Sequence, residues 1–417
     1  MGETVDAMPR RILLLARLGA LLGPDAATVR QSLVALYLNS STSFVAGAFL
    51  GSITGTLTRY PGLTVLVPAA IGLRGNTFGA FGNRISTSIH AGTFRVSARR
   101  DTVLGQNILA SMLLTVVVSL ALAAVAKLVA VGLNVPGSIG LLDLGVVSIV
   151  GGLLGSVAVL VLTVGLTGGA VRFGWDLDNV TAPLVSVLGD VLTLPALFVA
   201  TGLLGYHLVT PAVGVVLVAA ALALVVVGLR SRLPHLRRIV RESLPVLVMA
   251  GCISTGAGIA LEKRLGTFEA LPALLVLVPA HLSSAGALGG ILSGRLSTKL
   301  FLGLAEPSTT PSRGSRRDIV LTLLLGGLVY LYNGVGAHVV ARLIGARSPG
   351  LVDMVVVSLV AGFAVMLLVV ALAYYATITA VRTGLDPDTY GIPIVSSSVD
   401  FAGAVALVTV ITVLGLV

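Results

Sequence analysis

Long uninterrupted apolar runs constrain this chain more than any other feature. A helix needs about 20 apolar residues to cross the hydrocarbon core of a bilayer. Eleven such runs lie at 33–57, 61–82, 104–132, 141–170, 182–205, 210–229, 244–261, 271–293, 319–343, 351–380 and 392–417. They are continuous rather than alternating, which favours helices over barrel strands. Because 56% of the residues are hydrophobic and only 11% are charged, the sequence predicts an all-α polytopic membrane protein.

The basic residues lie mainly between the apolar runs and indicate orientation. With the N-terminus inside, 20 of the 27 Lys and Arg residues fall in cytoplasmic segments. This distribution predicts a multi-pass protein, most simply of the plasma membrane, with a cytoplasmic N-terminus. The segment 1–29 fits an interfacial amphipathic helix better than a signal peptide. No basic run is interleaved with aromatic residues, so we expect no nucleic-acid partner.

An internal repeat organises the chain. Residues 61–87 and 272–298 match without a gap at 12 of 27 positions, at an offset of 211. Beyond one deletion the offset is 210, and Asp190 then aligns with Asp400. We interpret 30–207 and 241–417 as two membrane repeats joined by 208–240, which holds an extra linker helix and a basic cytoplasmic loop.

The linker helix decides how the two repeats lie in the membrane. Each repeat has five spans, an odd number, so direct fusion would invert the second copy. One additional span keeps both copies parallel, and parallel copies should pair around a pseudo-two-fold axis along the membrane normal. A single chain would then suffice as an internal pseudo-dimer.

Asp190 and Asp400 are the principal candidate site residues, because each lies inside the fifth span of its repeat. An aspartate at the centre of a membrane helix costs about 2.5–3.5 kcal/mol. Two such acids facing each other across the axis would repel, unless protons or a cation lay between them. A divalent cation resolves the repulsion. In the alternative interpretation, each acid caps or hydrogen-bonds a neighbouring helix.

The second span of each repeat is also unusual. Pro68 and Pro279 remove helical hydrogen bonds, and Gly75 and Gly286 follow them. We expect broken helices there, lining a cavity. Asn76 would add a neutral oxygen, although its counterpart is Ala287. The glycines could instead serve only helix packing.

Other polar residues have weaker interpretations. Four acids precede the fifth spans, where they could gather cations at the inner mouth or cap helices; they are Asp176, Asp178, Asp386 and Asp388. His90 and His281 are expected to be structural, and Arg84 and Arg295 to be orientation anchors. No Walker A, CxxC, HExxH or GxSxG motif occurs, so we expect neither an enzyme nor a bound cofactor.

These patterns together resemble a known family. They are P-x6-P-x6-G-N-x7-R-x-S-T at 61–87, its variant at 272–298, and D-x-D-x4-P-x6-D at 176–190 and 386–400. The chain resembles the MgtE-type magnesium transporters and their duplicated relatives in solute carrier family 41. The resemblance implies a pathway for Mg2+ or a related divalent cation. It also implies that Asp190 and Asp400 hold the ion and that Asn76 lies beside it.

Three functional hypotheses follow. The first is divalent-cation transport, most simply of Mg2+, through a central site formed by both repeats, with the ion and membrane lipids as the only partners. The second is a cation-coupled exchanger of another ion, such as Co2+, Mn2+ or Na+. The third is a non-conducting regulatory membrane subunit.

Overall fold

A computed structural model describes residues 26–90, 92, 94–95, 97–173, 177–301, 303, 305–383 and 392–416. The described residues form helices and connecting loops, with no strand among them. The helices are α2 (Ala26–Ser52), α3 (Thr54–Arg59), α4 (Leu63–His90), α5 (Val103–Gly132), α6 (Leu141–Phe173), α7 (Leu177–Thr201), α8 (Val209–Leu229), α9 (Pro234–Glu262), α10 (Leu265–Ala270), α11 (Ala273–Phe301), α12 (Arg313–Leu343), α13 (Leu351–Thr383) and α14 (Ile392–Val413).

The predicted all-α membrane fold is confirmed. Eleven long helices of the described chain correspond in order to the eleven apolar runs. Nine of them are long and apolar enough to cross a membrane. The other two are α4, which carries Arg74 and Asn76 in its middle, and α7, whose described apolar part is only Leu188–Thr201. Both of these helices carry candidate site residues.

The second helix of each repeat differs from the sequence expectation. Helix α4 is continuous through Pro68 and Gly75, and α11 is continuous through Pro279 and Gly286. Each proline lies near the start of its helix, where the loss of one donor is tolerated because neighbouring helices cover the turn. The expected unwound segments are not observed.

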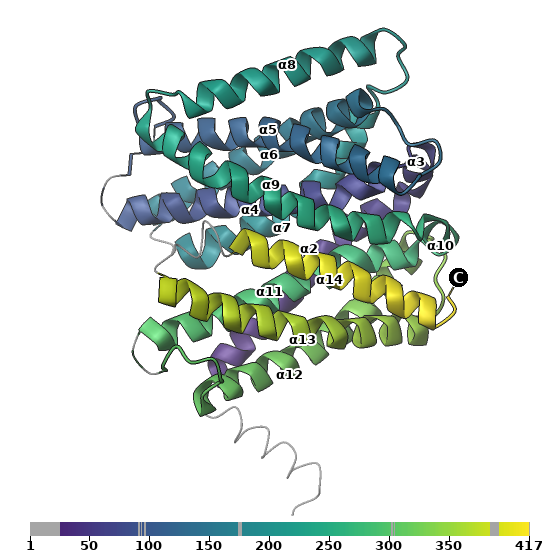
Figure 1. Cartoon of the computed structure of the whole chain (residues 1–417). Coiled ribbons are helices and arrows are strands. Elements are labelled where there is room, and N and C mark those ends of the chain that lie inside the picture. Colours follow the sequence, from purple (N-terminus) through teal and green to yellow (C-terminus); the bar gives the residue numbers. More distant parts are fainter. Residues whose placement is uncertain are drawn as a thin grey trace, which may run out of the picture.

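The two repeats interlock through their first two helices. Helix α2 packs along α11, and α9 packs along α4, so each first helix lies against the second helix of the other repeat (Figure 1). The backbones nearly touch at both crossings. A Cβ atom at Gly47 would lie 2.2 Å from the carbonyl oxygen of Val276, and one at Gly258 would lie 2.2 Å from that of Val65. Only glycine permits this approach.

Several contacts occur twice, at the offset of the sequence repeat. The Ser148 hydroxyl donates to the Ser119 carbonyl at 2.8 Å, and the Ser358 hydroxyl donates to the Tyr330 carbonyl at 2.6 Å. The short helices α3 and α10 occupy equivalent positions and contact each other. Such paired contacts are what a pseudo-two-fold arrangement of the two repeats would produce. We call the end of the bundle at which α3 and α10 lie the α3–α10 end.

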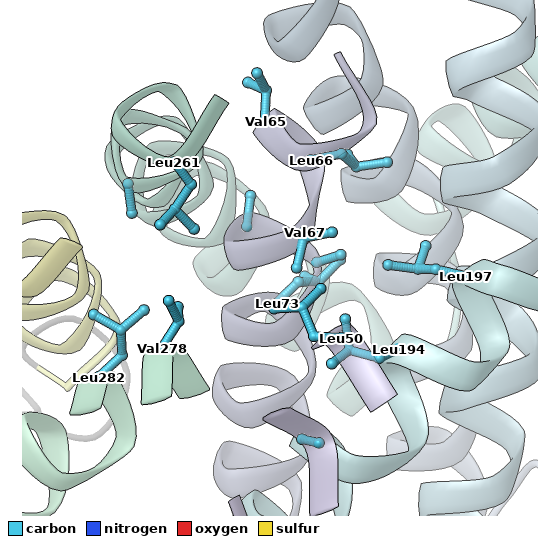
Figure 2. Packing of buried hydrophobic residues seen from close by; sticks show 14 of the residues in the cluster. Leu50, Val65, Leu66, Val67, Leu73, Leu194, Leu197, Leu261, Val278 and Leu282 are labelled. Carbon is cyan, nitrogen blue, oxygen red and sulfur yellow. The ribbon is translucent and has the colours of Figure 1, made fainter. Parts of the chain in front are cut away.

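One hydrophobic core spans both repeats. Leu50 of α2, Leu73 of α4 and Leu194 of α7 meet at its centre, and Val278 and Leu282 of α11 extend it toward the second repeat (Figure 2). The repeats therefore do not form separate globules. Helix α8, the linker, lies at the outer edge of the bundle against α5 and α6 and is mostly exposed (Figure 1).

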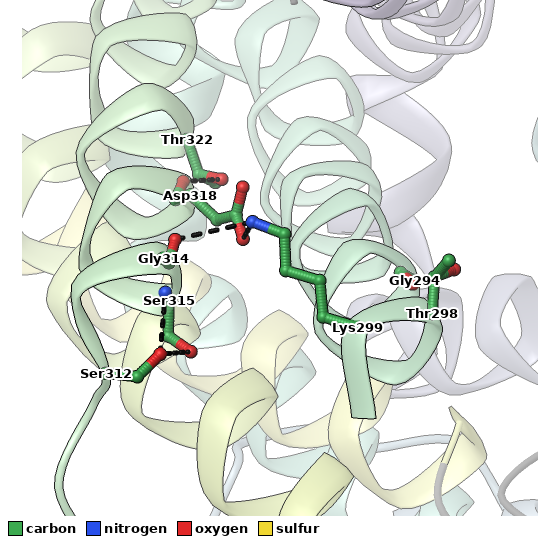
Figure 3. Close-up of polar contacts among 8 residues, drawn as sticks. All are labelled: Gly294, Thr298, Lys299, Ser312, Gly314, Ser315, Asp318 and Thr322. Atoms are coloured by element: carbon green, nitrogen blue, oxygen red, sulfur yellow. Dashed lines mark hydrogen bonds and ion pairs between the residues drawn. The ribbon is translucent and has the colours of Figure 1, made fainter. Parts of the chain in front are cut away.

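At the end opposite to α3 and α10, an ion pair joins two neighbouring helices. The Lys299 ammonium of α11 lies 2.6 Å from the Asp318 carboxylate of α12 (Figure 3). The side chain of Asp318 is buried, so this pair is shielded from solvent more than a surface pair would be. Ser312 caps the start of α12 by accepting a hydrogen bond from the Ser315 amide. These contacts fix α12 beside α11.

The glycine crossings give a stability prediction. Gly47→Ala and Gly258→Ala should each lower the free energy of unfolding by about 1–3 kcal/mol, because the added methyl overlaps a backbone carbonyl. Thermal melts in detergent measure the effect. Gly79→Ala is the matched control, since no described atom lies within 4 Å of its Cβ position. Equal melting temperatures for all three variants would contradict the interlock.

Candidate cation site

The candidate site lies where α7 and α14 approach α4. Helix α7 belongs to the same repeat as α4, whereas α14 reaches α4 from the other repeat. Asp190 of α7 is only 8% exposed, and Asp400 of α14 is partly buried. Their carboxyl groups interact electrostatically. The structure therefore brings together the two acids that the sequence singles out.

Asp400 and the residue before Asp190 both lie near one turn of α4. A Cβ atom at Gly72 would lie 3.9 Å from Oδ2 of Asp400. On the other side, a Cβ atom at Gly189, the residue before Asp190, would lie 4.0 Å from the amide nitrogen of Gly75. Neither carboxylate has a hydrogen-bond or ion-pair partner among the described residues. Their contacts thus do not match the alternative in which each acid bonds a neighbouring helix.

Asn76 lies one turn along α4 from Gly72 and joins the two repeats. Its side-chain oxygen accepts a hydrogen bond of 3.2 Å from the hydroxyl of Ser396 on α14. Ser396 and Asp400 are four residues apart and so share a face of α14. Asn76 also borders a cavity of about 10 Å3, together with Arg84 and Pro393. Such a cavity holds about one water molecule.

A serine that sequence reasoning missed also faces this turn. The hydroxyl of Ser254 on α9 would lie 3.4 Å from a Cβ atom at Gly72. It is buried and has no hydrogen-bond partner among the described residues, and the same is true of Ser43. Ser43 precedes Ser254 by the repeat offset of 211. The identity of these two serines in the aligned repeats was a signal that could have identified both.

Arg74 is a second residue that the sequence did not interpret. Its guanidinium is buried beside α6 and α7 and donates to the carbonyl oxygens of Ala70 and Gly151 and to the Thr193 hydroxyl. Gly155 provides the space, because a Cβ atom there would lie 2.7 Å from Nε. Oxygen atoms therefore solvate this charge, which makes no ion pair with a described carboxylate.

The second repeat carries different polar groups at the corresponding depth. His281 of α11 is fully buried, and its ring centroid lies 4.9 Å from that of Tyr330 on α12. Neither the ring nitrogens nor the Tyr330 hydroxyl have partners among the described residues. At the offset of 211, His281 corresponds to Ala70. Ala287, the counterpart of Asn76, offers no side-chain oxygen, so the two halves supply different ligands.

The glycines after the two prolines border open space. A Cβ atom at Gly79, Gly286 or Gly290 would meet no described atom within 4 Å. Close helix packing therefore does not explain these three positions.

The remaining candidate residues are the four acids before the fifth spans and the two arginines at the ends of the second spans. Asp176, Asp386 and Asp388 lie outside the described residues. Asp178 is the second residue of α7, and its side chain is not among those that the structure describes. The Arg84 guanidinium donates to Asn107 at 2.7 Å, and that of Arg295 lies 3.4 Å from the Ser32 hydroxyl. These contacts tie helices together.

The fold and the site define a class of protein. Two carboxylates inside a multi-pass helical bundle, accompanied by neutral oxygens, are the arrangement of a cation pathway across a membrane. In the described part of the chain, no three His, Cys, Asp or Glu side chains gather to form a conventional metal cage. The molecule is a polytopic membrane protein with an intramembrane acidic site.

Comparison with known families agrees with this class and identifies the family. The model of the MgtE family, described as a divalent cation transporter, matches residues 67–200 and again 278–410. These two stretches cover more than half of the chain. The chain belongs to the MgtE family of divalent cation transporters, and it is a transport protein rather than an enzyme.

Curated relatives support the same assignment. Solute carrier family 41 member 3 of Mus musculus is 26% identical over 371 residues, which cover 82% of this chain and 73% of the relative. Solute carrier family 41 member 2 of Homo sapiens is 26% identical over 372 residues, covering 82% of this chain but 62% of that protein. No solved structure matches the chain significantly.

Ser254 provides a test of the site. Ser254→Ala should leave the free energy of unfolding nearly unchanged, because the lost hydroxyl has no described partner. It should nevertheless lower divalent-cation flux in liposomes, because it removes an oxygen beside Asp400. Ser358→Ala is the control: it breaks a buried hydrogen bond of 2.6 Å and should cost about 1 kcal/mol of stability. Unchanged flux in Ser254→Ala would exclude this serine from the site.

Proposed function

We propose that this protein transports Mg2+ through a central site to which both repeats contribute, with Asp190 and Asp400 as its acids and Asn76 beside them. The observation that carries the proposal is the position of the two acids. They come from different repeats and interact electrostatically, and Asp400 and the residue before Asp190 lie near the same turn of α4. A cation between them would compensate both charges at once.

Electrostatics favour a divalent ion. Each ionised aspartate in a membrane helix costs about 2.5–3.5 kcal/mol even without a neighbour of like charge. Two nearby carboxylates disfavour each other's ionisation further. One divalent cation balances both carboxylate charges, whereas a monovalent ion leaves a net negative charge in a poorly solvated place.

The ligand types favour Mg2+. Oxygen atoms of carboxylate, amide and hydroxyl groups surround the turn, and Cys252, the chain's single cysteine, is exposed. Mg2+ prefers six oxygen ligands at about 2.0–2.1 Å and gives up its water reluctantly. Two carboxylates cannot supply six ligands, so the ion would keep much of its water shell. Binding through water is weak enough to permit release.

Passage requires the helices to move. The cavity beside Asn76 has room for about one water molecule, and Arg84 borders it. A hydrated Mg2+ ion is far larger than this space. We therefore propose that α14 separates from α4 at the contact between Ser396 and Asn76 when the ion passes. This contact joins the two repeats, so its opening would involve a relative movement of the repeats.

Orientation and assembly follow from the sequence. The distribution of Lys and Arg favours a cytoplasmic N-terminus, and we propose the plasma membrane as the location. Because one chain supplies both acids, we also propose that a single chain forms a complete pathway. The cytoplasmic end would then be the end that carries Lys299.

The central prediction concerns the two acids. Asp190→Asn and Asp400→Asn keep the side-chain shape but remove the charge, so each should reduce Mg2+ uptake into proteoliposomes to nearly the level of protein-free liposomes. Fluorescent Mg2+ indicators trapped inside the vesicles measure the uptake. Thermal melts should show that both variants fold, because removal of a buried charge relieves a desolvation cost.

Glu269→Gln is the matched control. It also removes one carboxylate, but Glu269 is exposed on α10, far in sequence from both acids. Its uptake should equal that of the wild type. Wild-type uptake in both aspartate variants would refute the central site, and failure of the wild-type protein to transport any divalent ion would favour a regulatory subunit.

The retained water shell gives a separate prediction. Cobalt hexaammine is a trivalent cation of approximately the size of hydrated Mg2+, and it does not exchange its ligands. It should compete with Mg2+ for the site if the ion binds through water. A site that removes the water shell of the ion would be insensitive to cobalt hexaammine.

Repeating the flux measurement with imposed proton and sodium gradients distinguishes simple transport from coupled exchange. Only an exchanger responds to these gradients by more than the change in membrane voltage explains.

A further inference from the structure

A groove on the outer surface runs between the packed helices α9 and α14 near the α3–α10 end. Its volume is about 570 Å3, within the range of about 300–1,000 Å3 typical of ligand pockets. Its wall is formed by Ile259, Ala260, Phe401, Val405, Val408 and Val413. Phe401 and Val413 are among the exposed large hydrophobic residues, so the groove opens toward the surrounding lipid.

The groove is apolar along its length and cationic at one end. The hydroxyls of Thr409 and Thr412, which also border it, donate to carbonyls of their own helix and offer no donor to a ligand. Lys263 and Arg264 lie at the junction of α9 and α10, at the end of the groove. Neither cation forms an ion pair with a described residue. The groove thus joins a long apolar surface to two uncompensated positive charges.

The first repeat lacks this combination at the equivalent place. There, Phe49 of α2 and Phe198 of α7 meet edge to face, with ring centroids 5.7 Å apart. At the repeat offsets, these aromatic residues correspond to Ala260 and Val408, two wall residues of the groove. The space therefore lies where the second repeat has smaller side chains than the first.

The charges differ between the repeats in the same way. Lys263 and Arg264 correspond to Ser52 and Ile53 at the offset of 211. Ser52 donates its hydroxyl to the Phe49 carbonyl of its own helix. The apolar space and the cations therefore occur together in one repeat and are both replaced in the other.

We propose that this groove binds one anionic phospholipid, with an acyl chain along α9 and α14 and the phosphate at Lys263 and Arg264. A phospholipid matches both features, because its apolar chain and its anionic group are adjacent. The lipid would touch Phe401, which directly follows Asp400, so it would lie against the helix that carries one of the two acids. The binding itself does not depend on which ion is transported.

The test counts bound lipid. The purified protein is mixed with dioleoyl phosphatidylglycerol or dioleoyl phosphatidylcholine in detergent and analysed by native mass spectrometry. The wild type should retain one phosphatidylglycerol that Lys263→Gln/Arg264→Gln loses, and phosphatidylcholine should not replace it. Phosphatidylglycerol should also raise the melting temperature of the wild type more than that of the double variant.

Two further variants separate the groove from general surface charge. Arg342→Gln removes an exposed cation in the last turn of α12 and should retain the lipid. Ala260→Phe/Val408→Phe places the aromatic pair of the first repeat in the groove and should lose the lipid although both cations remain. If this variant fails to fold, the Lys263/Arg264 variant alone decides the matter.

Two results would overturn the proposal. One is equal retention of phosphatidylglycerol by the wild type and Lys263→Gln/Arg264→Gln. The other is an equal stabilisation by soluble glycerophosphoglycerol, because this headgroup lacks acyl chains and could not use the apolar groove.

Discussion

The close approach of helix backbones at Gly47 and Gly258 is the constraint on which the rest of the structure depends. In a membrane, lipid tails are as apolar as leucine, so helices associate through close packing rather than through the hydrophobic effect. Here the closest packing is between repeats, where α2 crosses α11 and α9 crosses α4. This interlock holds α4 in the interior of the bundle. Only a helix in that position can be approached by α7 from one repeat and by α14 from the other.

A helix so placed can solvate charge without water. The carbonyl oxygens of Ala70 and Gly151 surround the Arg74 guanidinium, and the Ser254 hydroxyl and the Asn76 amide face the turn that Asp400 borders. Apolar surface covers these polar groups on the lipid side. The arrangement favours an ion that carries part of its own solvation, because the protein supplies too few ligands to replace a full water shell.

Sequence reasoning predicted much of this organisation for physical reasons. Eleven long helices were predictable because membrane helices must be long and apolar. The equivalent positions of Asp190 and Asp400 in the two repeats were predictable because charged residues rarely align by chance in apolar repeats. The continuity of α4 through Pro68 was not predictable, since tertiary packing around a proline decides whether the helix breaks. Nor was the role of Ser254 evident: a serine in an apolar helix usually bonds to its own backbone, and only the fold shows that its hydroxyl has no described partner.

The differences between the repeats are as informative as their agreement. Duplicated copies begin with equal ligands on both sides of the axis, and each later substitution can change one side alone. Asn76 corresponds to Ala287, Ala70 to His281, and Phe49 to Ala260. A homodimer cannot acquire such differences, because one mutation alters both subunits. A fused chain can therefore keep the shared site at its centre while its two flanks diverge, and the cationic groove beside α14 is one such difference.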